Sequence, residues 1–256
     1  MKKLGLILSG GGVRGLAHVG LLEVLEAHDI RPYGIAGVSA GAIVGALYAG
    51  GCSPARVRQF WQEENPFSLD HFTWRKPGLI DAEKLTDSFE KYLPEDDFSA
   101  LRCKLWVAAT DLVSGKLRLF SEGPLIKPVL ASAAFPLIFF PVEIEGKLYQ
   151  DGGILNNFPY EPLLYTCDAL IGVNVSPMRK VDRKDLDSTF DVGQRVIELG
   201  IDTGVRERMA KCDVVVVPEG LVEVGTFDLK AMHRAYQIGK EAAEAQIEEI
   251  LAVMEE

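Results

Sequence analysis

The chain has few of the residues that build metal sites or disulfide frameworks. Only four cysteines occur among its 256 residues, and no two of them form a CxxC pair. Cysteines scattered in this way argue against a thiolate metal site and do not suggest a disulfide framework, so we expect them to be reduced core residues. They are Cys52, Cys103, Cys167 and Cys212.

The sequence also has few segments that resemble a signal peptide or a transmembrane helix. The first apolar stretch, Leu4 to Leu8, is followed at once by glycines, which leaves no room for the apolar region of a signal peptide. We therefore predict a cytoplasmic protein. The stretch from Gly34 to Cys52 is uncharged and nearly long enough to span a bilayer. Its six glycines argue against a transmembrane helix.

Positive charge is outnumbered by negative charge. The chain has 27 Lys and Arg residues against 37 Asp and Glu residues, a formal net charge of −10. This excess repels phosphate backbones and anionic membranes at long range, so we predict no nucleic-acid partner. Transient contact with a membrane surface stays open because no amphipathic basic helix stands out. The oligomeric state is open as well.

Apolar runs alternate with amphipathic segments along the chain, which is typical of α/β proteins. We predict a single domain, residues 1–256, with a three-layer α/β/α fold and a largely parallel central sheet. The expected strands are Lys3 to Leu8, Lys104 to Ala109, Leu170 to Val175 and Val214 to Val217. The expected helices are Leu16 to His28, Asp81 to Tyr92, Asp191 to Ala210 and Lys230 to Met254.

A glycine-rich loop follows the first expected strand. Gly10, Gly12 and Gly15 satisfy GxGxxG between a strand and a helix, the context of a dinucleotide site. Such a site also needs an acidic residue about twenty positions further on, and Ile35-Ala36-Gly37-Val38-Ser39 stands there instead. A dinucleotide-dependent oxidoreductase is therefore the weaker interpretation. The loop suits any negatively charged oxygen, because backbone N–H groups at a helix start attract negative charge.

A second motif occupies the position of the missing acid. Gly37-Val38-Ser39-Ala40-Gly41 is a strict GxSxG, with a strand-like segment before it and a helix-compatible segment after it. Gly37 and Gly41 permit a sharp turn that exposes the serine hydroxyl and holds it rigidly. A tight structural turn is the alternative. The strand-turn-helix context and the nearby glycine loop favour Ser39 as a nucleophile.

Histidine, the usual base for a serine nucleophile, is rare in this chain. Three of the four histidines are placed like surface or cap residues: His28, His71 and His233. His18 lies one turn into the helix after the glycine loop and stays as an alternative base. Helix packing is the commoner role for a histidine in that position.

Asp151 is the better candidate base. It closes the strand-like segment Lys147 to Gln150 and precedes Gly152 and Gly153, which allow close approach. A carboxylate with an ordinary pKa of about 3.9 is a weak base at neutral pH, and burial would raise that pKa. The alternative role of Asp151 is an ordinary turn, and Asp111 is the rival carboxylate.

Three motifs therefore follow one another along the chain: Gly10-Gly11-Gly12-Val13-Arg14-Gly15, Gly37-Val38-Ser39-Ala40-Gly41 and Asp151-Gly152-Gly153. In this order they resemble the patatin-like phospholipase family. The resemblance includes the Ala131 to Pro136 segment and ends near Pro162.

The resemblance implies a Ser39–Asp151 dyad without histidine and an oxyanion hole made by backbone N–H groups of Gly10, Gly11 and Gly12. It also implies that Arg14 braces this loop. The activity implied is hydrolysis of a fatty acyl ester or phospholipid without metal or cofactor. The competing hypothesis is a phosphate- or lipid-binding module of the same fold with little catalysis.

An acyl chain needs an apolar channel, and two segments are candidates for its lining. One is Phe135 to Pro141, for which ordinary core packing is the alternative, and the other is an aromatic loop with Phe67, Phe72 and Trp74 that is either a lid or a surface loop. The head group, chain length and ester position of the substrate depend on packing that the sequence does not specify.

Overall fold

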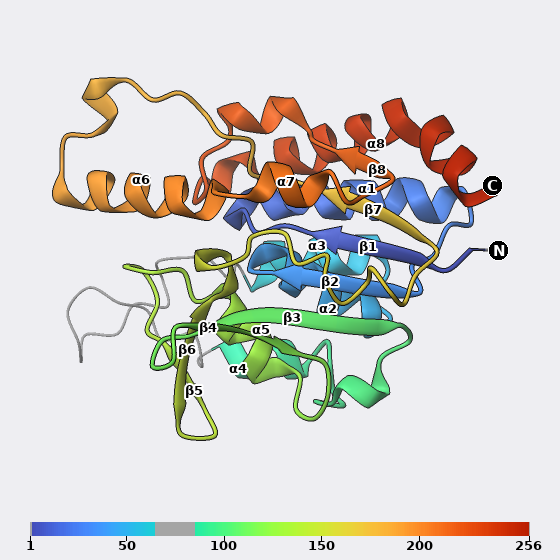
Figure 1. Cartoon of the computed structure of the whole chain (residues 1–256), viewed down its shortest axis with the longest axis horizontal. Helices are drawn as coiled ribbons and strands as arrows, with labels where there is room; N and C mark the ends of the chain where they lie inside the picture. The colour runs from blue at the N-terminus through green and yellow to red at the C-terminus, as the bar shows by residue number, and fades with distance from the viewer. Residues whose placement is uncertain (1, 65–84, 256) are drawn as a thin grey trace.

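The computed structural model describes residues 2–64 and 85–255, and its centre is a twisted sheet (Figure 1). Eight strands of the described chain form this sheet in the order β5-β6-β3-β2-β1-β7-β8, with β4 paired to β3. They are β1 (Leu4–Leu8), β2 (Gly34–Val38), β3 (Lys104–Asp111), β4 (Lys116–Phe120), β5 (Val142–Ile144), β6 (Lys147–Asp151), β7 (Ala169–Val173) and β8 (Val214–Val216).

The five strands from β3 to β8 in this order are parallel, which confirms the expected sheet. Every residue of β1, β2 and β7 is buried, as the continuous apolar runs predicted. Beyond β3 the sheet becomes antiparallel, since short turns join β3 to β4 and β5 to β6, and β6 pairs antiparallel with β3. Asp151 ends β6, opposite Ala109 of β3.

Helices cover both faces of the sheet. The thicker layer packs α1, α2, α5 and α8 against Leu4, Leu6 and Leu8. The thinner layer, around Ile7 and Phe158, includes α7. The helices are α1 (Leu16–Ala27), α2 (Ala40–Ala49), α3 (Pro54–Glu63), α4 (Thr86–Glu90), α5 (Ile126–Ala133), α6 (Thr189–Asp202), α7 (Val205–Met209) and α8 (Met232–Glu255).

The predicted helix from Asp191 to Ala210 is wrong in one respect. It is two helices, α6 and α7, separated at Thr203 and Gly204. Gly204 has φ 79°, a left-handed conformation that glycine adopts without strain and that interrupts an α-helix. The break turns α6 away from the sheet layer, and Figure 1 shows it projecting at the left of the molecule.

Three other predictions concern the uncharged stretch, the cysteines and the aromatic loop. The uncharged stretch Gly34 to Cys52 contains β2 and α2, and no helix of residues 2–64 and 85–255 is long and apolar enough to cross a membrane. The four cysteines form no disulfide and are only partly buried, and each packs against the edge of a hydrophobic core cluster. The start of the predicted helix at Asp81 and the residues His71, Phe67, Phe72 and Trp74 lie outside the described ranges.

Candidate active site

Ser39 occupies a strained turn between β2 and α2. Its φ of 53° and ψ of −124° are unusual for a residue with a side chain and are of the kind found at functional sites. A Cβ at Gly41 would lie 2.2 Å from the Leu8 carbonyl oxygen, so only glycine permits this contact. The Ser39 N–H donates to Ser132 Oγ at 2.8 Å. Strand, helix and α5 together fix the turn.

Asp151 lies beside this turn, buried at the end of β6 with 2% of its surface exposed. Its Oδ1 accepts a hydrogen bond from the Gly153 N–H at 2.8 Å. Its Oδ2 is buried and has no hydrogen-bond partner among the described residues. A buried, half-satisfied carboxylate costs folding free energy, and such costs concentrate where a group has a chemical task.

Burial raises the pKa of Asp151 to about 7, against the opposing effects of the Ser39 hydroxyl and the Gly153 N–H. The Ser39 hydroxyl makes no hydrogen bond of normal geometry to Oδ2, and catalytic hydrogen bonds are often long before substrate binds. A pKa near the working pH makes this carboxylate a far better proton acceptor than an exposed one. Burial thus makes the Asp151 carboxylate a stronger base than the sequence alone suggested.

The glycine loop contributes backbone donors to the same cavity. The Gly10 N–H is already occupied, because it donates to Asn157 Oδ1 at 3.0 Å. The N–H groups of Gly11 and Gly12 have no acceptor among the described residues, and both glycines line the cavity with Ser39. The predicted set of three donors is therefore narrowed to two that are available to a substrate oxygen.

Arg14 holds this loop from behind. Its Nε donates to the Gly11 carbonyl at 3.2 Å, and its Nη2 donates to Thr226 Oγ1 at 2.9 Å. Burial lowers its pKa to about 10, and Glu198 opposes that shift, so Arg14 stays charged at neutral pH. Gly15 packs where a Cβ would lie 2.5 Å from Cβ of Ala40. The loop and the turn at Ser39 are in direct contact.

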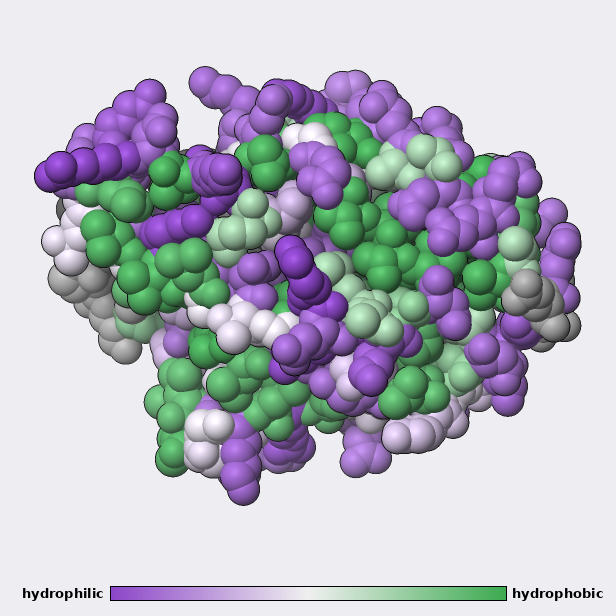
Figure 2. All heavy atoms as spheres, turned by 45° about the horizontal axis from the view of Figure 1, so that its top comes forward, coloured by the Kyte–Doolittle hydropathy of each residue, from purple (hydrophilic) through white to green (hydrophobic). Residues whose placement is uncertain are grey.

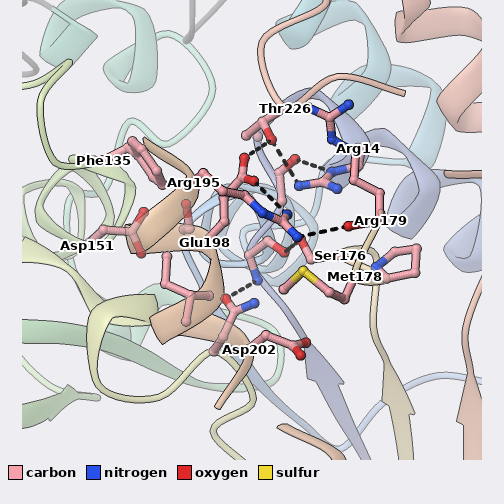
Figure 3. Close-up of a pocket in the computed structure, with 17 residues that line it drawn as sticks. Arg14, Phe135, Asp151, Ser176, Met178, Arg179, Arg195, Glu198, Asp202 and Thr226 are labelled. Atoms are coloured by element: carbon pink, nitrogen blue, oxygen red, sulfur yellow. Dashed lines mark hydrogen bonds and ion pairs between the residues drawn. The ribbon is translucent and has the colours of Figure 1, made fainter. Parts of the chain in front are cut away.

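These groups surround a cavity of about 60 Å³ (Figure 3). This is the volume of about two water molecules. We call the part of the lining that consists of Ser39, Asp151 and the glycine loop the floor of the cavity, and the part that comes from α6 its wall. The wall residues of α6 are Arg195, Glu198, Ile201 and Asp202.

The structure also shows where Gly152 and the residues of the predicted acyl channel lie. A Cβ at Gly152 would lie 2.2 Å from the Ala108 carbonyl oxygen, so the chain after Asp151 packs directly on β3. Phe135 lines the cavity, as the channel prediction requires. Phe139 is buried in the core and does not line this cavity, as the alternative of ordinary core packing predicted for it.

The alternative bases do not lie in the cavity. His18 is fully buried, its Nε2 donates to the Ser9 carbonyl at 2.8 Å, and burial lowers its pKa to about 4. It is a packing residue. Asp111 Oδ1 accepts from the N–H groups of Val113 and Ser114, and the Ser114 hydrogen bond is the first cause of its lowered pKa. It caps the turn between β3 and β4.

Three parts of the site were missed by the sequence interpretation: Ser132, Asn157 and the wall from α6. Ser132 and Asn157 are polar residues in otherwise apolar segments, and both are buried. That contrast is the sequence signal that marks them, because buried polar side chains are retained where they make hydrogen bonds.

Comparison with known proteins places the chain in a family. The family model for patatin-like phospholipase matches residues 6–164. The chain belongs to the patatin-like phospholipase family. The match contains all three motifs and ends near the point where the sequence resemblance ended. The part of the chain that contains α6, α7 and α8 lies beyond it.

Relatives of this patatin-like chain occur in bacteria and a virus. An uncharacterized NTE family protein of Mycobacterium tuberculosis is 33% identical over 181 residues, 68% of this chain and 49% of the relative. The chain thus spans about half the length of that relative. An uncharacterized protein of Acanthamoeba polyphaga mimivirus is 30% identical over 77% of this chain and 74% of its own length.

The patatin fold is also seen in a solved structure, that of VipD from Legionella pneumophila. It matches 96% of this chain and 67% of its own with a TM-score of 0.60 and 13% sequence identity. This likeness confirms the fold class.

Proposed function

We propose that this protein hydrolyses fatty acyl esters of lipids, with Ser39 as nucleophile and Asp151 as base. One observation carries the proposal. The buried Asp151 carboxylate has an unpartnered Oδ2 and a pKa raised to about 7, and it lines the same cavity as the strained Ser39. An ordinary turn aspartate has no reason to bear that cost.

The proposed reaction follows from this geometry. Ser39 Oγ attacks the ester carbonyl while Asp151 accepts its proton, and the oxyanion is held by the N–H groups of Gly11 and Gly12. Asp151 then returns the proton to the leaving alkoxide. In the second half, Asp151 takes a proton from water as the resulting hydroxide attacks the acyl-enzyme carbonyl. The bond to Ser39 Oγ then breaks, Asp151 returns the proton to Oγ, and the fatty acid is released.

The lipid substrate is supported by the family and by a named relative. A lysophospholipase of Candida glabrata is 27% identical over 67% of this chain, although the match is only 10% of that protein. The cavity bounded by Phe135 and Ile201 offers apolar contact beside the polar floor. Both observations favour an ester that has an apolar acyl chain.

The test is hydrolysis of p-nitrophenyl butyrate and octanoate with EDTA present. The proposal expects Ser39→Ala and Asp151→Asn to be inactive, while Asp111→Asn and His18→Ala retain activity. Asp111→Asn is the matched control, because it removes a carboxylate at the end of a neighbouring strand. Wild-type rates in Ser39→Ala would refute the proposal.

A fluorophosphonate probe separates the enzyme from a binding module of the same fold. An activated serine reacts with the probe in a one-to-one ratio, whereas a serine in an inert turn does not. We expect labelling of the wild type and none of Ser39→Ala. If the wild type is folded but unlabelled, the glycine loop is to be studied as a phosphate- or lipid-binding site.

A further inference from the structure

Asn157 is a buried polar residue for which the proposed reaction has no task. It is 4% exposed, and it lines the cavity together with Ser39, Asp151 and the glycine loop. Burying a side-chain amide costs folding free energy unless its oxygen and its nitrogen both make hydrogen bonds. The partners of these two atoms therefore decide what Asn157 does.

The glycine loop fixes one end of this amide. Asn157 Oδ1 accepts the Gly10 N–H at 3.0 Å. Because an N–H group donates, the amide atom that faces Gly10 is the oxygen, and Nδ2 with its two hydrogens is the other end. Nδ2 has no acceptor within residues 2–64 and 85–255, and it is not one of their fully enclosed unpaired atoms. The free end of the amide is therefore open to the cavity that Asn157 lines.

The amide of Asn157 lies close to both the Ser39 and the Asp151 side chains. A Cβ at Gly10 would be 2.6 Å from Asn157 Oδ1, 2.9 Å from Ser39 Cβ and 3.6 Å from Ser39 Oγ. A Cβ at Gly153 would be 3.0 Å from Asn157 Oδ1 and 3.0 Å from Asp151 Oδ1. Because neither glycine has a side chain, nothing separates the amide from these two groups.

Polar side chains in the wall of the cavity are already bonded to the protein. Helix α6 exposes apolar side chains on its outer side, at the left of Figure 2, and turns Arg195 and Glu198 into the cavity. Arg195 donates to the Arg179 carbonyl at 2.9 Å and contacts Glu198 at 3.4 Å (Figure 3). The amide nitrogen of Asn157 differs from them, since it is held in place and still has both hydrogens to donate.

We propose that Asn157 Nδ2 donates a hydrogen bond to the substrate carbonyl oxygen as that oxygen becomes negative, and so supplies a third oxyanion donor beside the Gly11 and Gly12 N–H groups. The Gly10 N–H is lost to the substrate, but it holds the amide that takes its place. No proton is transferred to or from Asn157. A donor that is fixed before the reaction stabilises the oxyanion without a cost of reorganisation. This role rests on the proposed function, because it requires an ester carbonyl that Ser39 attacks.

Two substitutions separate donation to the substrate from support of the glycine loop. Asn157→Asp keeps an oxygen for the Gly10 N–H and removes the free donor, whereas Asn157→Ala removes both without adding charge. We expect each variant to lower kcat for p-nitrophenyl butyrate by about 10²- to 10³-fold, the loss typical of one oxyanion donor. KM is expected to change by less than about three-fold, because the hydrogen bond strengthens only as the oxyanion forms.

Asn156→Asp is the matched control. Asn156 is also 4% exposed, but it does not line the cavity. Its Oδ1 accepts the Phe158 N–H at 2.9 Å, and its Nδ2 donates to Glu161 Oε1 at 3.0 Å. The same substitution there costs stability, because it sets two carboxylates against each other, and thermal unfolding measures that cost. We expect kcat of this control to fall by less than about ten-fold.

Each other pattern of results overturns the proposal. Loss of kcat in Asn157→Ala alone would assign Asn157 to support of the loop, and loss in Asn157→Asp alone would be an effect of the added charge. Wild-type kcat in both variants, a rise in KM at unchanged kcat, or an equal fall in Asn156→Asp would also contradict it. If Asn157→Ala does not fold, Asn157→Leu replaces it, because leucine fills a similar volume without polar atoms.

The fluorophosphonate probe keeps the two proposals apart. A wild type that is folded but not labelled at Ser39 refutes the proposed function, and with it an oxyanion at this site. A wild type that is labelled and hydrolyses the ester, compared with Asn157 variants of unchanged kcat, refutes the role of Asn157 alone.

Discussion

The turn at Ser39 and helix α6 border the same cavity, but they are built in contrasting ways. Every residue of β2 and α2 is buried, and the glycines of the turn are in contact with neighbouring backbone. In α6 no side chain is fully buried, and polar contacts such as Arg195 to Glu198 at 3.4 Å accompany its packing. The difference teaches that dense packing fixes the positions of Ser39 and the glycine turn, whereas the helix on the other side of the cavity is held by fewer buried contacts.

The cavity volume sharpens this comparison. About 60 Å³ is below the 300–1,000 Å³ that is typical of ligand pockets, and residues of α6 lie among those that bound this space. The floor has little freedom to expand because its glycines already touch backbone atoms.

The largest expected effect is on catalysis at the floor of the cavity. Asp151→Asn removes the proton acceptor and is expected to lower kcat by about 10⁴-fold. Glu198→Gln, in the wall, is expected to change kcat by less than about ten-fold, because it does not touch the reacting atoms. Steady-state hydrolysis of p-nitrophenyl butyrate checks both variants. Equal losses in the two would show that wall and floor act as one unit.

Packing at the turn gives the next largest effect. The new Cβ in Gly41→Ala would lie 2.2 Å from the Leu8 carbonyl, so the strand and helix must separate. We expect the free energy of unfolding to fall by about 3 kcal/mol. Urea unfolding followed by circular dichroism measures it. A variant with the midpoint of the wild type would contradict the rigid turn.

The raised pKa of Asp151 predicts two opposite trends with pH. In the proposed mechanism Asp151 acts as a base in its ionised form, so kcat/KM is expected to rise up to about pH 7 and then level off. The folded state holds this proton more tightly than the unfolded state, whose carboxyl pKa is 3.8. Stability is therefore expected to fall by a few kcal/mol as pH rises from about 4 to about 7.

Asp151→Asn is the control for the pH trends. It has no proton to exchange, so the difference in unfolding free energy between it and the wild type isolates the contribution of Asp151. We expect that difference to change between pH 4 and pH 7 and to be constant above about pH 8. A constant difference over the whole range would mean that the carboxyl has an ordinary pKa.

The smallest expected effect lies in α6. A Cβ at Gly200 has no atom within 4 Å, so Gly200→Ala meets no obstacle. Alanine favours the helix over glycine, and we expect a gain of up to about 1 kcal/mol. The melting temperature measures this gain. Destabilisation like that of Gly41→Ala would show that α6 is packed as tightly as α2.

The positions of Ser39 and Asp151 were predictable because each residue belongs to a short motif. GxSxG and Asp-Gly-Gly place Ser39 and Asp151 at strand ends by local rules of turn geometry, and the β/α alternation orders those strands in one sheet. The glycine loop was predictable in the same way. Its free donors were not, because the bond from Gly10 to Asn157 joins residues that are 147 positions apart.

The wall was not predictable from local pattern. The sequence indicates one helix from Asp191 to Ala210, since an isolated glycine such as Gly204 is tolerated in helices. Its left-handed conformation, and hence the direction of α6, depends on long-range packing. Burial of Asp151 is also a tertiary property, so its raised pKa required the structure.

The crossing of α1 and α8 has a consequence for the order in which the protein is made. A Cβ at Gly239 of α8 would lie 2.2 Å from the Ala17 carbonyl oxygen, and a Cβ at Gly20 of α1 would lie 2.4 Å from the Tyr236 carbonyl oxygen. Helix α1 starts directly after the glycine loop, and α8 ends the described chain. During translation the packing of α8 on α1 therefore cannot form until α8 has left the ribosome.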